Sequence, residues 1–364
     1  MKNGRTSDRW RNPLALCVAA LLAAVVLGGC GDDEEEGGGG GGGAAQEEVQ
    51  DVRMIIPFPP SIALLGLVIA QEQNYFEDEG IRLETVVAEE GSGQVNQLMI
   101  AGRETYGRSG PDLTMIANAE GHDLRMIATF ARGIFTIEAP TGSGVDSMED
   151  LAGKALGVTD LAGGEIGLVN QALAEAGLQP DEDVELKVVG PGGPAAFRAL
   201  ESGEIAAYAG ATNDFAAMEA QGLTSESIVP ESLRGLPSNG FVVRQETLDN
   251  EADREIAIKI VRAWLKGDQF ARLNPEEAFG IACEAVPEEC RDEKTAQAFF
   301  DRSIEVATPP EGVRPGENAP LDAFETIQNA LVEGGDMKQE VDLEEVFPTT
   351  YVDQFNEGLE EEGR

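Results

Sequence analysis

The chain beyond residue 51 alternates short apolar runs with longer segments that carry apolar residues at helical spacing. The short runs predict strands at Val52–Pro57, Ile81–Val87, Arg125–Phe130, Ile134–Ala139, Ala155–Thr159, Val184–Val189 and Ile205–Ala209. The longer segments predict helices at Ser61–Gln73, Gln94–Ala101, Leu113–Glu120, Ile166–Ala176 and Ala195–Ser202, and a capping box at Ser147–Asp150 marks another helix start. Strands separated by helices predict an α/β protein whose mostly parallel sheets are covered on both faces.

One order of elements occurs twice in this pattern. From Asn74 to Gly102, and again from Leu173 to Gly203, a helix ends at a glycine, a strand follows, and a glycine-rich turn leads into a helix that ends at a glycine. Two similar α/β lobes would produce this repetition. Chance would also produce it, because glycine is common at helix ends.

Residues 1–29 have the three parts of a secretory signal peptide. A start rich in Lys and Arg precedes the apolar segment Leu14–Leu27, which is too short for a transmembrane helix of about 20 residues. The closing segment Leu27–Cys30 resembles the lipobox of bacterial lipoproteins, which implies a lipid on Cys30; the alternative is an ordinary signal peptide with a chance cysteine. Residues 30–51 are acidic and rich in glycine, which is typical of a flexible tether.

The chain is strongly acidic, with 67 Asp and Glu against 26 Lys and Arg and a formal net charge of −41. That charge argues against nucleic acid or an anionic membrane surface as a partner. It fits the heavily hydrated surface of a protein from a high-salt habitat, although the sequence alone does not establish the habitat. Because 42% of the residues are hydrophobic, we expect a folded protein and not a disordered acidic one.

Two cysteines, Cys283 and Cys290, remain once the signal peptide and Cys30 are set aside. They flank a short stretch that contains a proline, and such a pair outside the cytoplasm predicts a disulfide. A zinc site is the alternative, but it needs four ligands and His122 is the only histidine. The sequence therefore predicts neither a metal site nor a cofactor.

Four segments carry a recognisable pattern of residues. Ala70–Gly80 resembles the pattern AxxxGYFxxEGL, and Ser147–Val158 resembles sxxDLkGKxvgv. Ala176–Leu186 resembles aGLxxxDVelv, and Val341–Phe355 resembles vdlxxxxtnxF. In this order they resemble bacterial solute-binding proteins of the nitrate, sulfonate and taurine type, which include relatives that bind thiamine-pyrimidine precursors. The match runs from Val52 to Phe355.

The resemblance implies a type II periplasmic-binding-protein fold, with two lobes joined by two crossover strands and a ligand between the lobes. Lobe 1 would comprise residues 52–136 and 238–355, and lobe 2 would comprise residues 137–237. Residues 356–364 would form an acidic tail. The family's usual Asp is missing where two helices end, and Asn74 replaces a usual glycine, so the resemblance does not fix the identity of the ligand.

Ligands of open parallel sheets bind beyond the strand ends, where helix N-termini present free N–H groups. Glycines there let the backbone approach a ligand, and Ser, Thr and Asn add hydrogen-bonding groups. Each of these residues is equally typical of an ordinary cap or turn. The candidate ligand-binding residues are Phe58, Ser61, Ser92, Gly93, Ser109, Gly110, Thr129, Arg132, Thr159, Gly163, Gly164, Gly192, Gly193, Thr212 and Asn213.

Arg132 and Arg108 stand out in a chain with so few cations. Arg132 is expected near the first crossover, where its guanidinium could clamp an anionic group; the alternative is a surface pair with a carboxylate. Phe58 and Trp264 would either line the cleft or, more in keeping with their type, belong to the core.

Enzyme signatures are weak in this chain. A Ser-His-Asp triad would have to use His122, which is expected in a surface turn. Gly91–Gly93 lacks the third glycine of a dinucleotide fingerprint, and no GxxxxGK[ST] loop occurs. One distant group with the implied fold makes a thiamine pyrimidine by consuming its own active-site histidine, but no predicted strand-end loop here contains a histidine.

The sequence therefore predicts a non-enzymatic solute-binding component of an ABC importer, held by lipid at the outer face of the cell membrane. Hinge closure would capture a small anionic or polar organic solute, such as a sulfonate, taurine, nitrate or a pyrimidine precursor. Its partners would be that small molecule and an ABC permease, and we expect a monomer. The alternative is a ligand-sensing protein that signals to a membrane receptor.

Overall fold

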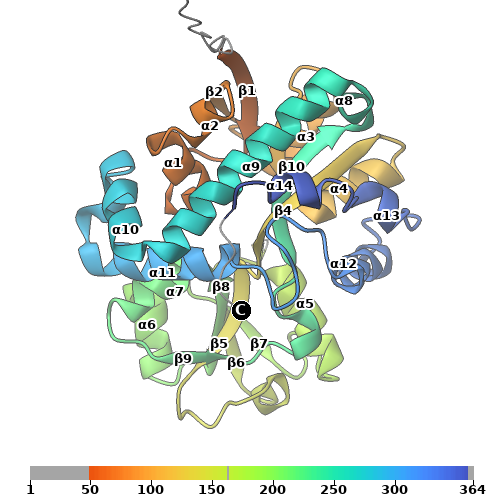
Figure 1. Cartoon of the computed structure of the whole chain (residues 1–364). Coiled ribbons are helices and arrows are strands. Elements are labelled where there is room, and N and C mark those ends of the chain that lie inside the picture. Colours follow the sequence, from red (N-terminus) through yellow and green to blue (C-terminus); the bar gives the residue numbers. More distant parts are fainter. Residues whose placement is uncertain (1–48, 162–163, 360–364) are drawn as a thin grey trace, which may run out of the picture. The chain divides into compact units, whose positions relative to one another are not determined.

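Two five-stranded sheets organise the part of the chain that the computed structural model describes, residues 49–161 and 164–359 (Figure 1). These residues belong to a unit that spans residues 47–364. The predicted signal peptide, Cys30, nearly all of the predicted tether, Gly163 and the end of the predicted tail lie outside the described residues. The candidate lipid anchor therefore remains a prediction.

Sheet A has the strand order β2-β1-β3-β10-β4. Strands β1, β2 and β3 are parallel, and β10 is antiparallel to both β3 and β4, so that β10 alone runs against the other four. Every residue of β4 is buried, as expected for a strand that is covered on both faces. The strands are β1 (Gln50–Ile56), β2 (Ile81–Val87), β3 (Tyr106–Ser109), β4 (Leu124–Arg132) and β10 (Pro237–Arg244).

Sheet B repeats this plan with the order β7-β6-β8-β5-β9. Strands β6, β7 and β8 are parallel, and β5 alone runs against the others. The predicted α/β fold with mostly parallel strands is therefore confirmed. We call sheet A with its helices lobe 1, and sheet B with its helices lobe 2. The strands are β5 (Phe135–Pro140), β6 (Ala155–Val158), β7 (Glu185–Val188), β8 (Ala207–Ala211) and β9 (Ser225–Ser227).

The chain crosses between the sheets twice, from β4 to β5 and from β9 to β10. The crossings touch each other, because the Gly133 N–H donates to the Leu236 carbonyl at 2.9 Å. Gly133 and Gly235 have φ angles of 59° and 63°, a region that side chains with a Cβ rarely adopt. A Cβ on Gly133 would also lie 3.3 Å from the Gly235 Cα. The two crossover segments thus require glycine where they pass each other.

Helices connect the strands within each lobe, and the described chain after β10 contains helices and loops but no strand. In lobe 1 they are η1 (Ile62–Leu64), α1 (Leu65–Glu72), α2 (Tyr75–Asp78), α3 (Ser92–Ile100) and α4 (Pro111–Ala119). In lobe 2 they are η2 (Met148–Leu151), α5 (Ile166–Glu175), α6 (Pro194–Glu201), α7 (Thr212–Glu219) and η3 (Glu231–Leu233). The C-terminal helices are α8 (Gln245–Asp249), α9 (Glu251–Leu273), α10 (Pro275–Ala285), η4 (Glu289–Arg291), α11 (Glu293–Ala307), α12 (Leu321–Gly334), α13 (Leu343–Val346) and α14 (Val352–Phe355).

The long helix α9 packs against α1 over the core of lobe 1. Two glycines make this contact close: a Cβ on Gly267 would lie 2.1 Å from the Gly66 carbonyl oxygen, and a Cβ on Gly66 would lie 2.7 Å from Trp264. Trp264 is 2% exposed and stacks on Phe130 with ring centroids 4.3 Å apart. Trp264 therefore belongs to the core, the alternative that its residue type favoured.

The sequence pattern missed β3, β9 and β10. These strands contain glycine, proline, serine or buried charge where a typical strand carries β-branched or aromatic residues. They form because the backbone N–H and C=O groups of the neighbouring strands pair with theirs. At the elements that the pattern did predict, it agrees with the structure to within a few residues, and Ser147 and Asp150 form the expected capping box. It predicted no element range beyond Ala209, so the extents of helices α7 to α14 were not anticipated.

A disulfide joins helix α10 to helix η4. Cys283 and Cys290 are joined by an S–S bond of 2.01 Å, with their Cα atoms 5.5 Å apart. Cys290 also packs against the cluster that α1, α10 and α11 build around Phe300. The bond therefore closes a short loop at one margin of lobe 1.

Candidate functional site

The ends of parallel strands bring the candidate residues to one edge of each sheet. In lobe 1, strands β1, β2 and β3 end at the same edge, and the turns that follow contain most candidates from this lobe. In lobe 2, the parallel strands β6, β7 and β8 end at one edge in the same way. Helix N-termini follow all six strand ends, so both edges present backbone N–H groups and positive dipole ends.

The lobe 1 edge carries an aromatic ring beside a buried cation. Phe58 follows β1 and is 36% exposed, so the expectation that it belongs to the core is wrong. Its ring lies 5.5 Å from the guanidinium carbon of Arg108, which sits on β3 and is 3% exposed. The turn after β1 rises out of the core because Pro57, Pro59 and Pro60 cannot extend the sheet. The ring and the guanidinium therefore make a cation–π contact at this edge.

The other lobe 1 candidates sit where helices begin. Ser61 precedes η1, Ser92 and Gly93 open α3, and Gly110 precedes α4. None of these hydroxyls makes a capping bond in the described chain. Ser109 is the last residue of β3 and is fully buried.

The lobe 2 edge is organised by two buried carboxylates. Glu165 accepts a bond of 2.8 Å from the Thr159 N–H and a shorter one from the Thr159 hydroxyl. Asp214 accepts bonds of 2.8 Å from the Gly192 N–H and 2.9 Å from the Ala211 N–H. Thr159 and Gly192 are therefore already bonded within lobe 2, and in this structure they stabilise their own turns.

The remaining lobe 2 candidates have different roles. A Cβ on Gly164 would lie 2.5 Å from the Phe135 ring, so glycine is required there for packing. Gly193 opens α6 with φ of 151°, and Asn213 lies exposed near the start of α7. The Thr212 N–H donates to the Ile134 carbonyl at 3.1 Å, which ties the start of α7 to the first crossover.

Two cavities lie along the crossover between the lobes. The cavity that we call the α11-side cavity has a volume of about 290 Å³. The one that we call the α5-side cavity has a volume of about 190 Å³. The first is lined by residues that include Arg132, Thr136, Glu138, Thr212, Arg234 and Arg302. The second is lined by residues that include Asp112, Ile134, Phe135, Gly164, Leu168, Ser238 and Ile327. Both cavities thus have walls from lobe 1, lobe 2 and the crossover.

Buried polar atoms without a protein partner gather on the lobe 1 edge. Within the described chain, Nε and Nη1 of Arg108, the Ser109 hydroxyl, Nη1 of Arg132 and Oδ1 of Asn239 have no hydrogen-bond partner. They sit at adjacent strand ends, because Gly240 pairs with Ser109 and Pro237 pairs with Arg132. Leaving such a group unbonded costs about 1–3 kcal/mol. A polar ligand or water at this edge would recover that free energy.

Both arginines of this edge keep their charge at neutral pH. Burial lowers the pKa of Arg108 to about 9, and the charge of Asp268 partly opposes that shift. Burial likewise lowers the pKa of Arg132 to about 10, opposed by Glu317. In a chain with a net charge of −41, two buried cations at one edge select for negatively charged or acceptor-rich groups.

Arg132 and Thr129 are partly used by the C-terminal segment. Nη2 of Arg132 donates to the carbonyls of Glu317 and Ala319 at 2.9 and 2.7 Å, so Arg132 is neither a surface arginine nor fully free for a ligand. The Thr129 hydroxyl donates to Oδ1 of Asn318 at 2.7 Å. Thr129 therefore anchors the loop before α12, and of the buried guanidinium nitrogens of Arg132, Nη1 remains without a protein partner.

Asp268 of α9 is a buried carboxylate that interacts electrostatically with Arg108 and has a pH-dependent charge. Burial raises the pKa of Asp268 to about 7, while Arg272, Arg108 and the Gly66 N–H oppose the rise. The folded chain thus holds a proton on Asp268 that the unfolded chain, with an ordinary pKa of about 3.9, releases. The stability from this group is fully present below about pH 4 and is lost as the pH rises through about 7.

We therefore expect Asp268→Asn to flatten the dependence of stability on pH. Between about pH 4 and 7, the free energy of unfolding of the variant should fall by roughly 2–4 kcal/mol less than that of the wild type. Urea unfolding at a series of pH values measures this, with Asp322→Asn on the exposed face of α12 as the control. Parallel curves for the wild type and Asp268→Asn would show that Asp268 titrates normally.

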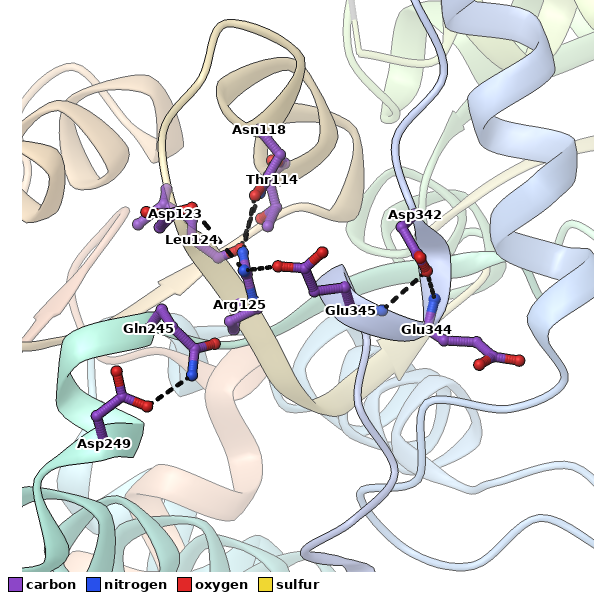
Figure 2. Close-up of polar contacts among 10 residues, drawn as sticks. All are labelled: Thr114, Asn118, Asp123, Leu124, Arg125, Gln245, Asp249, Asp342, Glu344 and Glu345. Atoms are coloured by element: carbon purple, nitrogen blue, oxygen red, sulfur yellow. Dashed lines mark hydrogen bonds and ion pairs between the residues drawn. The ribbon is translucent and has the colours of Figure 1, made fainter.

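The opposite edge of sheet A also contains a buried arginine, but protein groups engage it (Figure 2). Nη1 of Arg125 donates to Oδ1 of Asn118 at 2.9 Å and to the Leu124 carbonyl at 3.0 Å, and Nη2 bonds Glu345 of α13. Arg125 therefore fastens α13 to the start of β4. His122 lies at this edge as well, in the turn before β4.

Metal binding and membrane spanning find no support in the described residues. No group of three or more His, Cys, Asp or Glu side chains among them could hold a metal ion. Across residues 49–161 and 164–359, no helix combines the length and the apolar character that crossing a membrane requires.

Sequence reasoning missed Asn239, Asp268 and Phe135 as residues of this site. Asn239 lies at the start of β10, a strand that the apolar pattern did not reveal. Asp268 lies inside a 23-residue helix, where a carboxylate normally faces solvent. The one signal for Asp268 is its neighbour Gly267, because a glycine inside a long helix often marks a close contact.

Comparison with known proteins places the chain among proteins of this fold. Residues 61–278 match the family described as NMT1/THI5 like. The riboflavin-binding protein RibY of Chloroflexus aurantiacus is 25% identical over 248 residues, 66% of this chain and 68% of that protein. The 4-amino-5-hydroxymethyl-2-methylpyrimidine phosphate synthase of Legionella pneumophila is 25% identical over 235 residues, 61% of this chain and 69% of that protein.

A solved structure shows the same fold at lower identity. The periplasmic aliphatic sulphonate binding protein SsuA of Escherichia coli superimposes with a TM-score of 0.60 and 17% identity. The superposition covers 82% of this chain and 92% of SsuA. The type II periplasmic-binding-protein fold that the resemblance implied is thereby confirmed.

Proposed function

Because the chain belongs to the NMT1/THI5-like family, we propose that it is an extracytoplasmic solute-binding protein that captures a small molecule between its two lobes. The observation that carries the proposal is the set of buried, unbonded polar atoms on Arg108, Ser109, Arg132 and Asn239. Folded proteins rarely leave several buried polar atoms together without hydrogen bonds unless a ligand or water bonds to them. The edge borders the crossover, where both lobes can reach one ligand.

The proposed mechanism is hinge closure. The two crossover segments contain glycines with positive φ where they touch, and few residues need to change conformation for the lobes to rotate. A ligand that bonds the lobe 1 edge and reaches the lobe 2 turns favours the closed form by its differential affinity for that form.

The proposed ligand is a small anionic or polar organic solute. Two buried guanidiniums favour a sulfonate, a taurine-like solute or nitrate, because each can accept several hydrogen bonds from an arginine. The exposed ring of Phe58 beside Arg108 equally suits a planar, pyrimidine-like precursor. The relatives named for riboflavin and for a pyrimidine phosphate, and the structural neighbour named for aliphatic sulphonates, span the same two classes.

We propose binding and not catalysis. The relative named as a synthase raises the question of an enzyme, and the related chemistry that the family resemblance implies consumes an active-site histidine. His122 is the only histidine of the chain, and it lies before β4, at the edge of sheet A opposite the strand ends that carry Arg108 and Ser109. It therefore cannot reach a ligand held at the crossover.

The proposed partner is an ABC permease, which would receive the solute from the closed form. The alternative partner is a membrane receptor that reads the same closure as a signal. Neighbouring genes separate the two: a permease with an ATPase favours import, and a sensor kinase favours signalling. We expect the protein to act as a monomer.

We also propose that a lipid on Cys30 anchors the protein at the outer face of the cell membrane. Cys30→Ser removes the only thiol of the lipobox-like segment. The variant is therefore expected to move from the membrane fraction to the soluble extracytoplasmic fraction. Immunoblots of the two fractions measure this, with Cys17→Ser as the control that should stay in the membrane. Retention of Cys30→Ser in the membrane would contradict the anchor.

A thermal-unfolding screen tests the proposed function. The probes are nitrate, ethanesulfonate, taurine, riboflavin and 4-amino-5-hydroxymethyl-2-methylpyrimidine, each at constant ionic strength. A bound solute raises the melting temperature by mass action. A shift with a member of one ligand class supports the proposal and names that class, and no shift with any probe would count against it.

A further inference from the structure

Helix α11 joins the two lobes independently of the crossover segments. Its Ala296 and Phe300 are buried in a lobe 1 cluster with residues of α1 and α10. Its other face packs against α7 of lobe 2. A helix that belongs to one lobe and packs on the other has to slide, separate or act as a pivot when the lobes move.

The α7 contact is held by Arg302, which bonds two carboxylates of lobe 2. Nη1 and Nη2 of Arg302 donate to the two oxygens of Glu138 on β5, at 2.9 and 3.1 Å. Nε and Nη2 donate to Oε1 of Glu219 on α7, at 3.1 and 2.6 Å. The guanidinium also lies 5.1 Å above the centroid of the Phe215 ring. Every nitrogen of Arg302 is therefore engaged by lobe 2.

This cluster, which we call the Arg302 clamp, is largely shielded from water. The Arg302 side chain is 15% exposed and the Glu138 side chain 7%, and Glu138 accepts a further bond of 2.6 Å from the Ser225 hydroxyl. Burial alone would lower the pKa of Arg302, but the hydrogen bonds and charges of Glu219 and Glu138 raise it above its ordinary value. Breaking a buried pair leaves uncompensated charges and is strongly unfavourable, so the clamp resists separation.

The opposite side of the crossover has no such connection. The α5-side cavity is lined by Asp112 and Ile327 of lobe 1 and by Leu168 and Gln171 of lobe 2. Among these described residues no hydrogen bond or ion pair links one lobe to the other. The interface is therefore asymmetric, with a buried ionic clamp at α11 and a mainly apolar, unbonded cavity at α5.

We propose that Arg302 is a positioning residue that makes the α7–α11 contact a pivot, so that the lobes separate along the α5-side cavity and a solute enters there. The inference rests on the hinge motion of the proposed function, but it adds the axis and the side of opening. A rotation about α11 keeps the clamp intact, and it separates α12 from η3 and parts the mainly apolar walls of the α5-side cavity.

Distance measurements between spin labels test the pivot without any ligand. In the full chain with Cys17→Ser and Cys30→Ser, one label pair is placed at the exposed positions Asp301 and Gln221, across the α7–α11 contact. A second pair is placed at Asn329 of α12 and Asn170 of α5, across the α5-side cavity. Double electron–electron resonance then gives the distribution of distances for each pair.

We expect a single narrow distance for the first pair and a broad or two-peaked distribution for the second. Arg302→Met should broaden the first distribution and shift it to longer distances. Three results would overturn the pivot: a first pair as broad as the second, two narrow distributions, or a first pair that Arg302→Met leaves unchanged. If Arg302→Met does not fold, the comparison of the two wild-type distance distributions decides whether the α7–α11 contact is a pivot. Failure of the proposed function would instead appear as the absence of any solute binding in the thermal screen.

Discussion

Replacing Arg108 by methionine is expected to abolish most solute binding while leaving the fold intact. In the described chain, Nε and Nη1 of Arg108 bond no protein group, so a bound solute is their natural partner. Removing one member of a buried, charge-assisted contact costs about 2–5 kcal/mol. The dissociation constant should therefore rise by roughly thirtyfold or more. Isothermal titration calorimetry with the probe that gives the largest thermal shift measures this change.

The control for Arg108→Met is Arg82→Met on β2. Arg82 carries the same charge in the same sheet, but its side chain is 64% exposed and pairs with Asp51 at the surface. We expect its dissociation constant to match that of the wild type. If Arg108→Met binds the solute as tightly as Arg82→Met, Arg108 does not belong to the site.

Replacing Gly267 by alanine is expected to destabilise lobe 1 severely. In an ordinary helix this change would be favourable by about 1 kcal/mol, because glycine is a poor helix former. Here the added Cβ would lie 2.1 Å from the Gly66 carbonyl oxygen and 3.0 Å from the Ala70 nitrogen. Both are backbone atoms of α1 and cannot rotate away, so α9 has to shift. We expect a loss of about 2–4 kcal/mol in the free energy of unfolding, measured by urea denaturation.

Gly280→Ala in α10 is the matched control. Gly280 also lies inside a helix, but a Cβ there would meet nothing within 4 Å. The free energy of unfolding should rise by about 0.5–1 kcal/mol in this variant. Equal effects of the two substitutions would show that α1 and α9 do not depend on the glycine contact.

The sequence predicted the class of fold because its strongest periodic segments are those that the two sheets need. Strands β1, β2 and β6 and helices α3, α4 and α5 carry continuous apolar faces, and their order implies parallel sheets. The family resemblance then supplied the two-lobed arrangement. Strand β10 escaped detection because its first residues, Pro237–Gly240, are polar or small, and its pairing comes from the flanking strands β3 and β4.

The site was predictable in outline and not in detail. The predicted glycine, serine and threonine residues lie at the two sheet edges in the structure, and their role in binding stays a prediction. Which of them remain available was not predictable, because Thr159 and Gly192 are bonded by carboxylates six and 22 residues away in the chain. Arg108 became the leading candidate only when burial and missing partners were visible. Such properties depend on packing between distant segments, which no local pattern in the sequence records.

We expect one small molecule to bind between the lobes and to be held by Arg108. Native mass spectrometry of the purified chain in the presence of the five probes tests this expectation most directly. We expect a wild-type peak with the added mass of one probe molecule per chain, and the loss of that peak in Arg108→Met under the same conditions. No added mass with any probe, or the same added mass in both chains, would contradict it.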